Sequence, residues 1–194
     1  MTRSILALVL FVTVSASAVA QSTALDTVNE PRSGVPFPVS LTPPGDTTPH
    51  WIMGTGVRQR TIFRVKIYAF GLYVDPEGAR ASLSRFARLS ASTLERDESF
   101  YRHLLDLNFT MTLRLVMTRT IDGNDVAEAF DDALRPRMTR AVTDTNNSRE
   151  LAVLERFRGY LEVDEVRSGT EIVFSCGPAG RLATSVGGDE RPPI

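Results

Sequence analysis

The chain has 194 residues, of which 42% are hydrophobic, 23% are charged and 8% are aromatic, and its formal net charge is −1. This composition is typical of a globular protein of one domain and excludes disordered, collagen-like and coiled-coil chains. The 22 basic residues are matched by 23 acidic ones, so no excess of positive charge favours nucleic acid or an anionic membrane surface as a partner. The single cysteine, Cys176, cannot form a disulfide within the chain.

The first twenty residues are predicted to be a signal peptide. Arg3 gives a basic start, an apolar run covers 5–14, and small residues precede a cleavage site after Ala20. The run is well short of the roughly twenty residues that span a bilayer, so we expect no stable membrane anchor. The protein is therefore expected to be exported, to the periplasm or outside the cell if its source is a bacterium. Residues 21–34 predict a flexible lead-in, and one domain is expected over 35–194.

The first half of this domain predicts strands followed by short helices. Proline and glycine over 35–46 indicate a short edge strand and a turn, and Trp51–Met53 indicates the returning strand. Thr61–Val74 is the strongest strand pattern, and its final part is apolar on both faces, as in a strand that is covered on both sides. A helix is expected over 75–88, opened by an aspartate that can accept from free N–H groups, and another over 98–105.

The second half predicts a strand, two helices and a final hairpin. Phe109–Thr118 alternates apolar and mainly polar side chains, as a strand with one buried face does. A helix is expected from Asp122 and should end before Pro136, because proline disfavours helical backbone in the preceding residue. A further helix is expected over 148–161 and a hairpin over 171–186. Together these elements predict an α+β domain with helices packed against a mainly antiparallel sheet.

Patterns that would indicate a specific chemistry are weak. Gly54-Thr55-Gly56 lacks a third glycine and continues as a strand, whereas a pyrophosphate cradle needs a helix N-terminus there. His50 and His103 lie far apart, with no cysteine or third histidine nearby, so we expect packing or surface histidines, no metal and no other cofactor. Pattern alone thus leads to an exported α+β domain with an apolar core.

Several segments resemble the chalcone isomerase family, and they occur in the family's order. The resemblance covers about 35–186 and implies an open-faced β-sandwich, in which a layer of helices covers a large, mainly antiparallel sheet and leaves an apolar cleft between them. Family members continue into a terminal helical segment, whereas this chain stops at Ile194. The domain is thus expected to be short at its C-terminus, either as a natural short form or as a truncated sequence. The segments are Val35–Gly45, Gly54–Arg58, Lys66–Val74, Arg119–Gly123 and Ser175–Gly180.

The resemblance also implies a ligand site. The family's buried arginine after the glycines corresponds to Arg58, and a strand position that holds a threonine in the isomerases holds Tyr68. The isomerases' tyrosine and asparagine positions fall on Val126 and Ala133, so the polar network around an enone is missing. An arginine with a strand tyrosine resembles the family's fatty-acid-binding branch, in which the two side chains hold a carboxylate. A guanidinium offers paired hydrogen bonds for such a group, and a phenol adds one more.

We therefore predict an exported protein that binds a fatty-acid-like carboxylate in an apolar cleft without catalysis. One alternative is an intramolecular lyase of the chalcone isomerase type, acting on an unknown enone with Arg58 and Tyr68 as its polar groups. Another is a purely structural domain with a filled cleft. The oligomeric state is left open. The expected ligand-binding residues are Arg58, Tyr68, Phe70, Leu72, Ile121, Val126 and Phe130.

Overall fold

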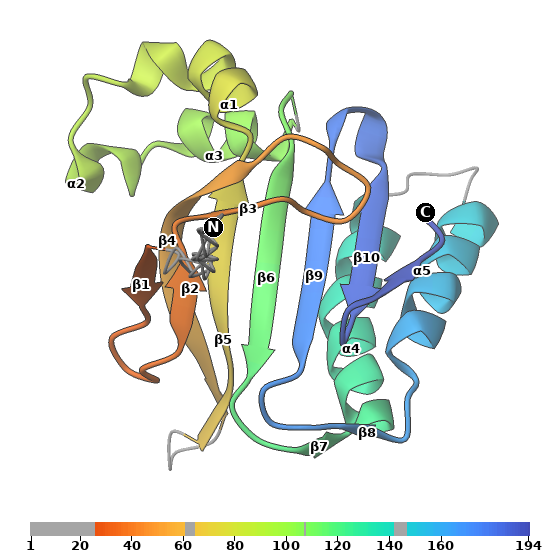
Figure 1. The fold of residues 1–194 in the computed structure, drawn as a ribbon. Helices are drawn as coiled ribbons and strands as arrows, with labels where there is room; N and C mark the ends of the chain where they lie inside the picture. Colours follow the sequence, from red (N-terminus) through yellow and green to blue (C-terminus); the bar gives the residue numbers. More distant parts are fainter. Residues whose placement is uncertain (1–25, 61–64, 107, 142–146) are drawn as a thin grey trace, which may run out of the picture.

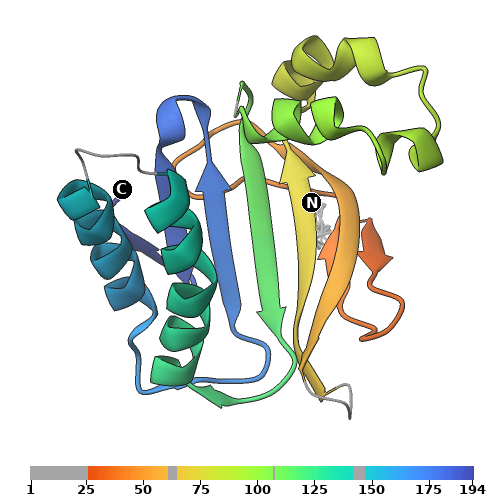
Figure 2. The ribbon, with the colours of Figure 1, turned by 180° about the vertical axis from the view of Figure 1, so that it is seen from behind.

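The computed structural model describes residues 26–60, 65–106, 108–141 and 147–194. The predicted signal peptide and the first part of the predicted lead-in lie outside these ranges. Within them the α+β class is confirmed: a long antiparallel sheet forms the body, two helices lie on one of its faces, and short helices stand at one end (Figure 1, Figure 2). None of the described helices is long and apolar enough to cross a membrane.

The main sheet of the described residues has seven strands in the order β11-β10-β9-β6-β5-β4-β3, and every neighbouring pair is antiparallel. The predicted late hairpin is confirmed as β9 and β10. Two small sheets, β1-β2 and β7-β8, accompany it. The main strands are β3 (Ser40–Leu41), β4 (His50–Arg60), β5 (Val65–Val74), β6 (Met111–Met117), β9 (Glu171–Cys176), β10 (Leu182–Val186) and β11 (Asp189–Arg191). The small sheets use β1 (Thr27–Asn29), β2 (Pro36–Pro38), β7 (Ile121–Asp122) and β8 (Glu165–Val166).

The central strand β6 is covered on both faces. Leu115 and Met117 are almost fully buried against the helices, as the alternation predicts. Thr112 on the opposite face is also fully buried, and its hydroxyl donates to Ser175 Oγ at 3.0 Å. The same hydroxyl lies 2.8 Å from Nδ1 of His50, a packing histidine as expected. Because these polar groups are hydrogen-bonded to one another, the face that the alternation marks as polar can also be buried.

The short helices follow β5 directly at one end of the sheet. Asp75 caps the first of them as predicted, accepting from the N–H groups of Glu77 and Gly78. The expected end of this helix near residue 88 is wrong, because the α-helix stops at Leu83 and a 3₁₀ turn then places Phe86 in the core, edge-on to Phe100 at 5.3 Å. The elements of this end are α1 (Pro76–Leu83), η1 (Ser84–Phe86), α2 (Ala91–Leu94) and α3 (Glu98–Leu105).

The helices α4 (Gly123–Ala141) and α5 (Asn147–Leu161) lie together on one face of the sheet (Figure 2). Phe130 of α4, Phe157 of α5 and Phe174 of β9 contact one another, with ring centroids 5.5–5.9 Å apart. The expected end of α4 before Pro136 is wrong, since this proline lies inside the helix. Side chains before and after it, those of Leu134 and Met138, pack against the main core. This packing offsets the backbone hydrogen bond that a proline removes.

Part of the segment predicted as a flexible lead-in is ordered strand. Thr27–Asn29 pairs with Pro36–Pro38, and the turn between them is organised by Glu30, whose side chain is 1% exposed. Its carboxylate accepts from the N–H groups of Arg32 and Ser33 and from the Ser33 hydroxyl. Burial alone would raise the pKa of Glu30, but these hydrogen bonds outweigh it and lower the pKa.

Candidate functional site

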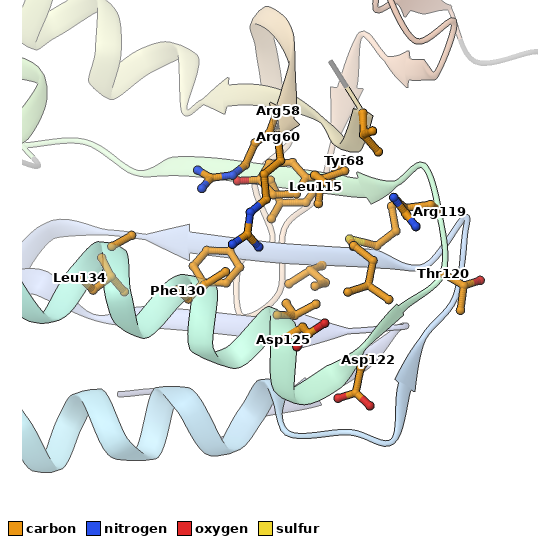
Figure 3. A pocket seen from close by; sticks show the side chains of 18 residues that line it. Arg58, Arg60, Tyr68, Leu115, Arg119, Thr120, Asp122, Asp125, Phe130 and Leu134 are labelled. Carbon is orange, nitrogen blue, oxygen red and sulfur yellow. The ribbon is translucent and has the colours of Figure 1, made fainter. Parts of the chain in front are cut away.

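A cavity of about 570 Å³ lies between the sheet and α4, where the predicted cleft was expected. Figure 3 shows its side chains converging from β4, β5 and β6 on one side and from α4 on the other. A volume of this size is within the range of small-molecule sites. The apolar lining is Val65, Ile67, Leu115, Met117, Ile121, Val126, Ala129, Phe130, Ala133, Leu134 and Ile172, and the polar lining is Arg58, Arg60, Tyr68, Arg119, Thr120, Asp122 and Asp125.

The pairing of β4 with β5 brings the two predicted head-group residues together. Arg58 lies directly opposite Tyr68, and directly opposed residues of an antiparallel pair share a face of the sheet. The register then shifts, so that Gln59 is paired with Lys66 and one residue of β5, Ile67, is extra. Such a bulge re-aims side chains locally. Ile67 and Tyr68, although adjacent in sequence, therefore both line the cavity.

Arg60 also points into the cavity, beside Arg58 (Figure 3). The two arginines are two residues apart on β4 and hence on the same face of the sheet. The sequence reasoning missed Arg60, although its spacing from Arg58 in a predicted strand is the pattern that would have identified it. Arg119 and Thr120, which follow β6, were missed as ligand candidates as well.

Five of the seven expected ligand-binding residues line the cavity, and Phe70 and Leu72 do not. Both lie on the cavity face of β5, as their alternation with Tyr68 requires. The ring of Phe70 lies against β4 at Gly56, where an added Cβ would be 2.5 Å from a ring carbon. This side chain therefore fills space beside a glycine and packs against the main core rather than lining the cavity.

The cavity carries charges of both signs. Arg58, Arg60 and Arg119 are exposed, and none of them forms an ion pair with a residue in the described ranges. The expectation of a buried arginine at position 58 is thus wrong, because the cavity is open at this strand. Asp122 and Asp125 lie at the start of α4, away from β4 in the chain but close after Arg119. Tyr68, which lies opposite Arg58, is half-buried.

A second set of polar groups lies on the opposite face of the sheet and does not reach the cavity. His50 is fully buried there, with Nδ1 near the Thr112 hydroxyl and Nε2 3.3 Å from Oδ2 of Asp46. The hydroxyl of Tyr73 is buried on this face without a hydrogen-bond partner among the described residues. Any ligand held by Arg58 and Tyr68 is therefore separated from these groups by the sheet itself.

Comparison with known proteins gives one family and one fold. The family model described as chalcone-flavanone isomerase matches residues 33–194. Fatty-acid-binding protein 2 of Arabidopsis thaliana is 32% identical over 167 residues, which are 82% of this chain but 41% of that protein. Chalcone–flavanone isomerase 1B-1 of Glycine max is 26% identical over 159 residues, covering 81% of this chain and 70% of that protein. The crystal structure of the Arabidopsis thaliana fatty-acid binding protein AtFAP1 has the same fold, with a TM-score of 0.71, 23% identity and coverage of 87% and 82% of the two chains.

Proposed function

Since the chain belongs to the chalcone-flavanone isomerase family, we propose that it binds a fatty-acid-like carboxylate in the cavity between the sheet and α4, without catalysing a reaction. The observation that carries the proposal is the pairing of Arg58 with Tyr68 at the edge of a cavity whose remaining lining is mainly apolar. The names of two relatives, both fatty-acid-binding proteins of Arabidopsis thaliana, support the same ligand class.

The polar end of the cavity suits a carboxylate. The guanidinium of Arg58 can donate two parallel hydrogen bonds to the two oxygens, and the hydroxyl of Tyr68 can donate a third. Hydrogen bonds to a charged group contribute about 1.5–3 kcal/mol each. Arg58 has no ion-pair partner in the described ranges that a ligand would have to displace.

The rest of the cavity suits an acyl chain. Its lining along α4 runs from Asp125 to Leu134, and nine helical rises of about 1.5 Å give this wall a length of roughly 13 Å. The opposite wall is formed by aliphatic side chains of the sheet, such as Leu115 and Ile172. Each methylene that moves from water into such an environment contributes about 0.8 kcal/mol before ordering costs. The acyl chain of the ligand therefore supplies most of the affinity, and the arginine favours the acid over uncharged ligands of the same length.

The lining does not favour the lyase alternative. Stabilising charge in a transition state needs polar groups that are already in place around the reacting atoms. Val126 and Ala133 line the cavity at the positions where the isomerases are expected to carry a tyrosine and an asparagine. Arg58 and Tyr68 alone hold an anion but offer no second set of donors around an enone.

Binding of decanoate and of the uncharged decanol by the purified chain tests the proposal, with calorimetry or fluorescence displacement as the readout. Arg58→Ala should weaken decanoate binding about tenfold to a hundredfold and leave decanol binding unchanged, since only the acid uses the guanidinium. Arg88→Ala, an exposed arginine outside the cavity, is the matched control and should bind as the wild type does. Absence of decanoate binding, or equal binding by wild type and Arg58→Ala, would overturn the proposal.

We also propose that the protein is exported, with cleavage after Ala20. The basic start and the apolar run over 5–14 support this part of the proposal. Intact-mass measurement of the protein from its native source tests it, because a chain beginning at Gln21 is expected. A protein that retains Met1–Ala20 in the cell interior would contradict it.

A further inference from the structure

The cavity carries one more positive charge at β4 than a fatty acid can use. A carboxylate has one negative charge and two oxygens, and the paired donors of Arg58 with the hydroxyl of Tyr68 already match it. Arg60 contributes a second guanidinium on the same strand and the same face. Figure 3 shows both guanidinium groups pointing into the cavity rather than away from it.

The two aspartates of the cavity lie on a different segment from the two arginines of β4. Asp122 and Asp125 belong to the segment that follows Arg119, and no ion pair joins either of them to Arg60 in the described ranges. With Arg119 they complete the charged lining, which holds three arginines and two aspartates in all. Arg58 and Arg60 together carry two positive charges at the β4 end, one more than a single carboxylate can neutralise, and a ligand that covers the cavity would partly desolvate them. Desolvating a charge without a partner is costly.

Resting on the proposed function for the site and its acyl chain, we propose that the same cavity also takes, and prefers, a single-chain lipid with a phosphate monoester in place of the carboxylate, held by Arg58, Arg60 and Tyr68 while its chain lies along α4. Such a head carries close to two negative charges at neutral pH and three acceptor oxygens. It can accept from both guanidinium groups and from the phenol at once. Arginine is the residue best suited to this geometry, because its planar fork matches phosphate oxygens in pairs.

The test compares decyl phosphate with decanoate, since the two share a chain length and differ in the head. Wild-type protein should bind decyl phosphate at least about tenfold more tightly at about pH 7.5. This preference should shrink at about pH 5, below the second phosphate pKa near 6, where the head carries a single charge. Decyl sulfate, whose head keeps a single negative charge over the same pH range, reports any change in the protein itself.

Arg60→Ala should remove most of the preference for decyl phosphate and leave decanoate binding close to the wild-type value. Arg60→Gln keeps the length and polarity of the side chain and should behave in the same way, which separates charge from packing. Arg88→Ala, outside the cavity, should keep the preference. Inorganic phosphate alone should bind far more weakly than decyl phosphate, because it lacks the chain.

Three results would overturn the inference. Decanoate could bind as tightly as decyl phosphate, Arg60→Ala could weaken both ligands equally, or inorganic phosphate could bind as well as decyl phosphate. In the first two cases acyl binding itself is still observed, so the proposed function survives while the phosphate head is rejected. If neither decanoate nor decyl phosphate binds, the proposed function fails together with the inference.

Discussion

Gly123, the first residue of α4, sets how closely the helical wall of the cavity approaches the chain after α5. A Cβ at this position would lie 1.7 Å from the carbonyl oxygen of Val163, and 2.7 Å and 2.9 Å from its C and N atoms. Ordinary contact begins at 3.4 Å, so Gly123→Ala demands a separation larger by the difference, 1.7 Å. All three atoms are backbone, and no side-chain rotation can supply this space.

We expect Gly123→Ala to lower the free energy of unfolding by about 2 kcal/mol or more. Overpacking costs up to about 3 kcal/mol where neighbours can yield, and the backbone of Val163 yields little. Alanine returns at most about 1 kcal/mol through its better helix propensity. For a domain of this size, a loss of about 2 kcal/mol lowers the Tm by roughly 4–8 °C. The decrease should appear both in thermal unfolding followed by circular dichroism and in urea titration.

Gly159→Ala is the matched control, because it makes the same chemical change in the neighbouring helix α5. An added Cβ there meets no heavy atom within 4 Å, and the residue is exposed. The free energy of unfolding of this variant should rise by up to about 1 kcal/mol. Gly159→Ala is thus expected to stabilise the fold, whereas Gly123→Ala is expected to destabilise it. A Tm for Gly123→Ala equal to or above that of the wild type would refute the close approach of α4 to Val163.

Two further predictions concern the face of the sheet opposite the cavity. Burial raises the pKa of Tyr73 to about 12, although nearby Arg114 opposes the shift without reaching hydrogen-bond geometry. Tyr73→Phe should therefore leave the free energy of unfolding unchanged or raise it, because the substitution removes a buried hydroxyl without a described partner. The ultraviolet titration of the variant should lack the phenol with the raised pKa. A clear decrease in the free energy of unfolding would contradict this prediction. Hydrogen bonds from the backbone N–H of Thr48, and then of Thr47, lower the pKa of Asp46 below its usual 3.8. The carboxylate thus stabilises the fold above pH 3.8, and this stabilisation is lost as the pH falls through the lower pKa of the folded state. Asp46→Asn should therefore make the free energy of unfolding depend less on pH in the acid range. An equal pH dependence in the variant and the wild type would disprove the assignment.

Local sequence signals were sufficient where one short segment determines the element. The alternation of Phe109–Thr118 and the capping position of Asp75 both predicted what the structure has. These signals were insufficient where packing against residues distant in the sequence determines the local backbone conformation. The helical backbone at Pro136 depends on core contacts of its neighbours, and the 3₁₀ turn after Leu83 depends on Phe86 meeting Phe100. None of these contacts is visible in the local pattern.

The candidate site was predictable in type and only partly in detail. Alternation places Tyr68, Phe70 and Leu72 on one face of a strand, but it does not say which part of that face α4 leaves open. The family resemblance supplied Arg58 and its partner, and their direct opposition is now a feature of the structure. Arg60 carried a readable signal, its spacing from Arg58, which matters only once the cavity is known to extend along β4.

The extra residue Ile67 changes which side chains of β5 face the cavity. Side chains after it follow the pleat set by Tyr68 opposite Arg58, whereas those before it follow the opposite phase, with Val65 on the cavity side and Lys66 turned away. Removing Ile67 would leave Lys66 opposite Gln59 and turned away, whereas adding one residue to β4 opposite Ile67 would restore one-to-one pairing and turn Lys66 toward the ligand, while the Arg58–Tyr68 pair kept its register. A one-residue change in length, without any substitution in the lining, is thus a simple route by which relatives with this fold could alter the charge of the cavity.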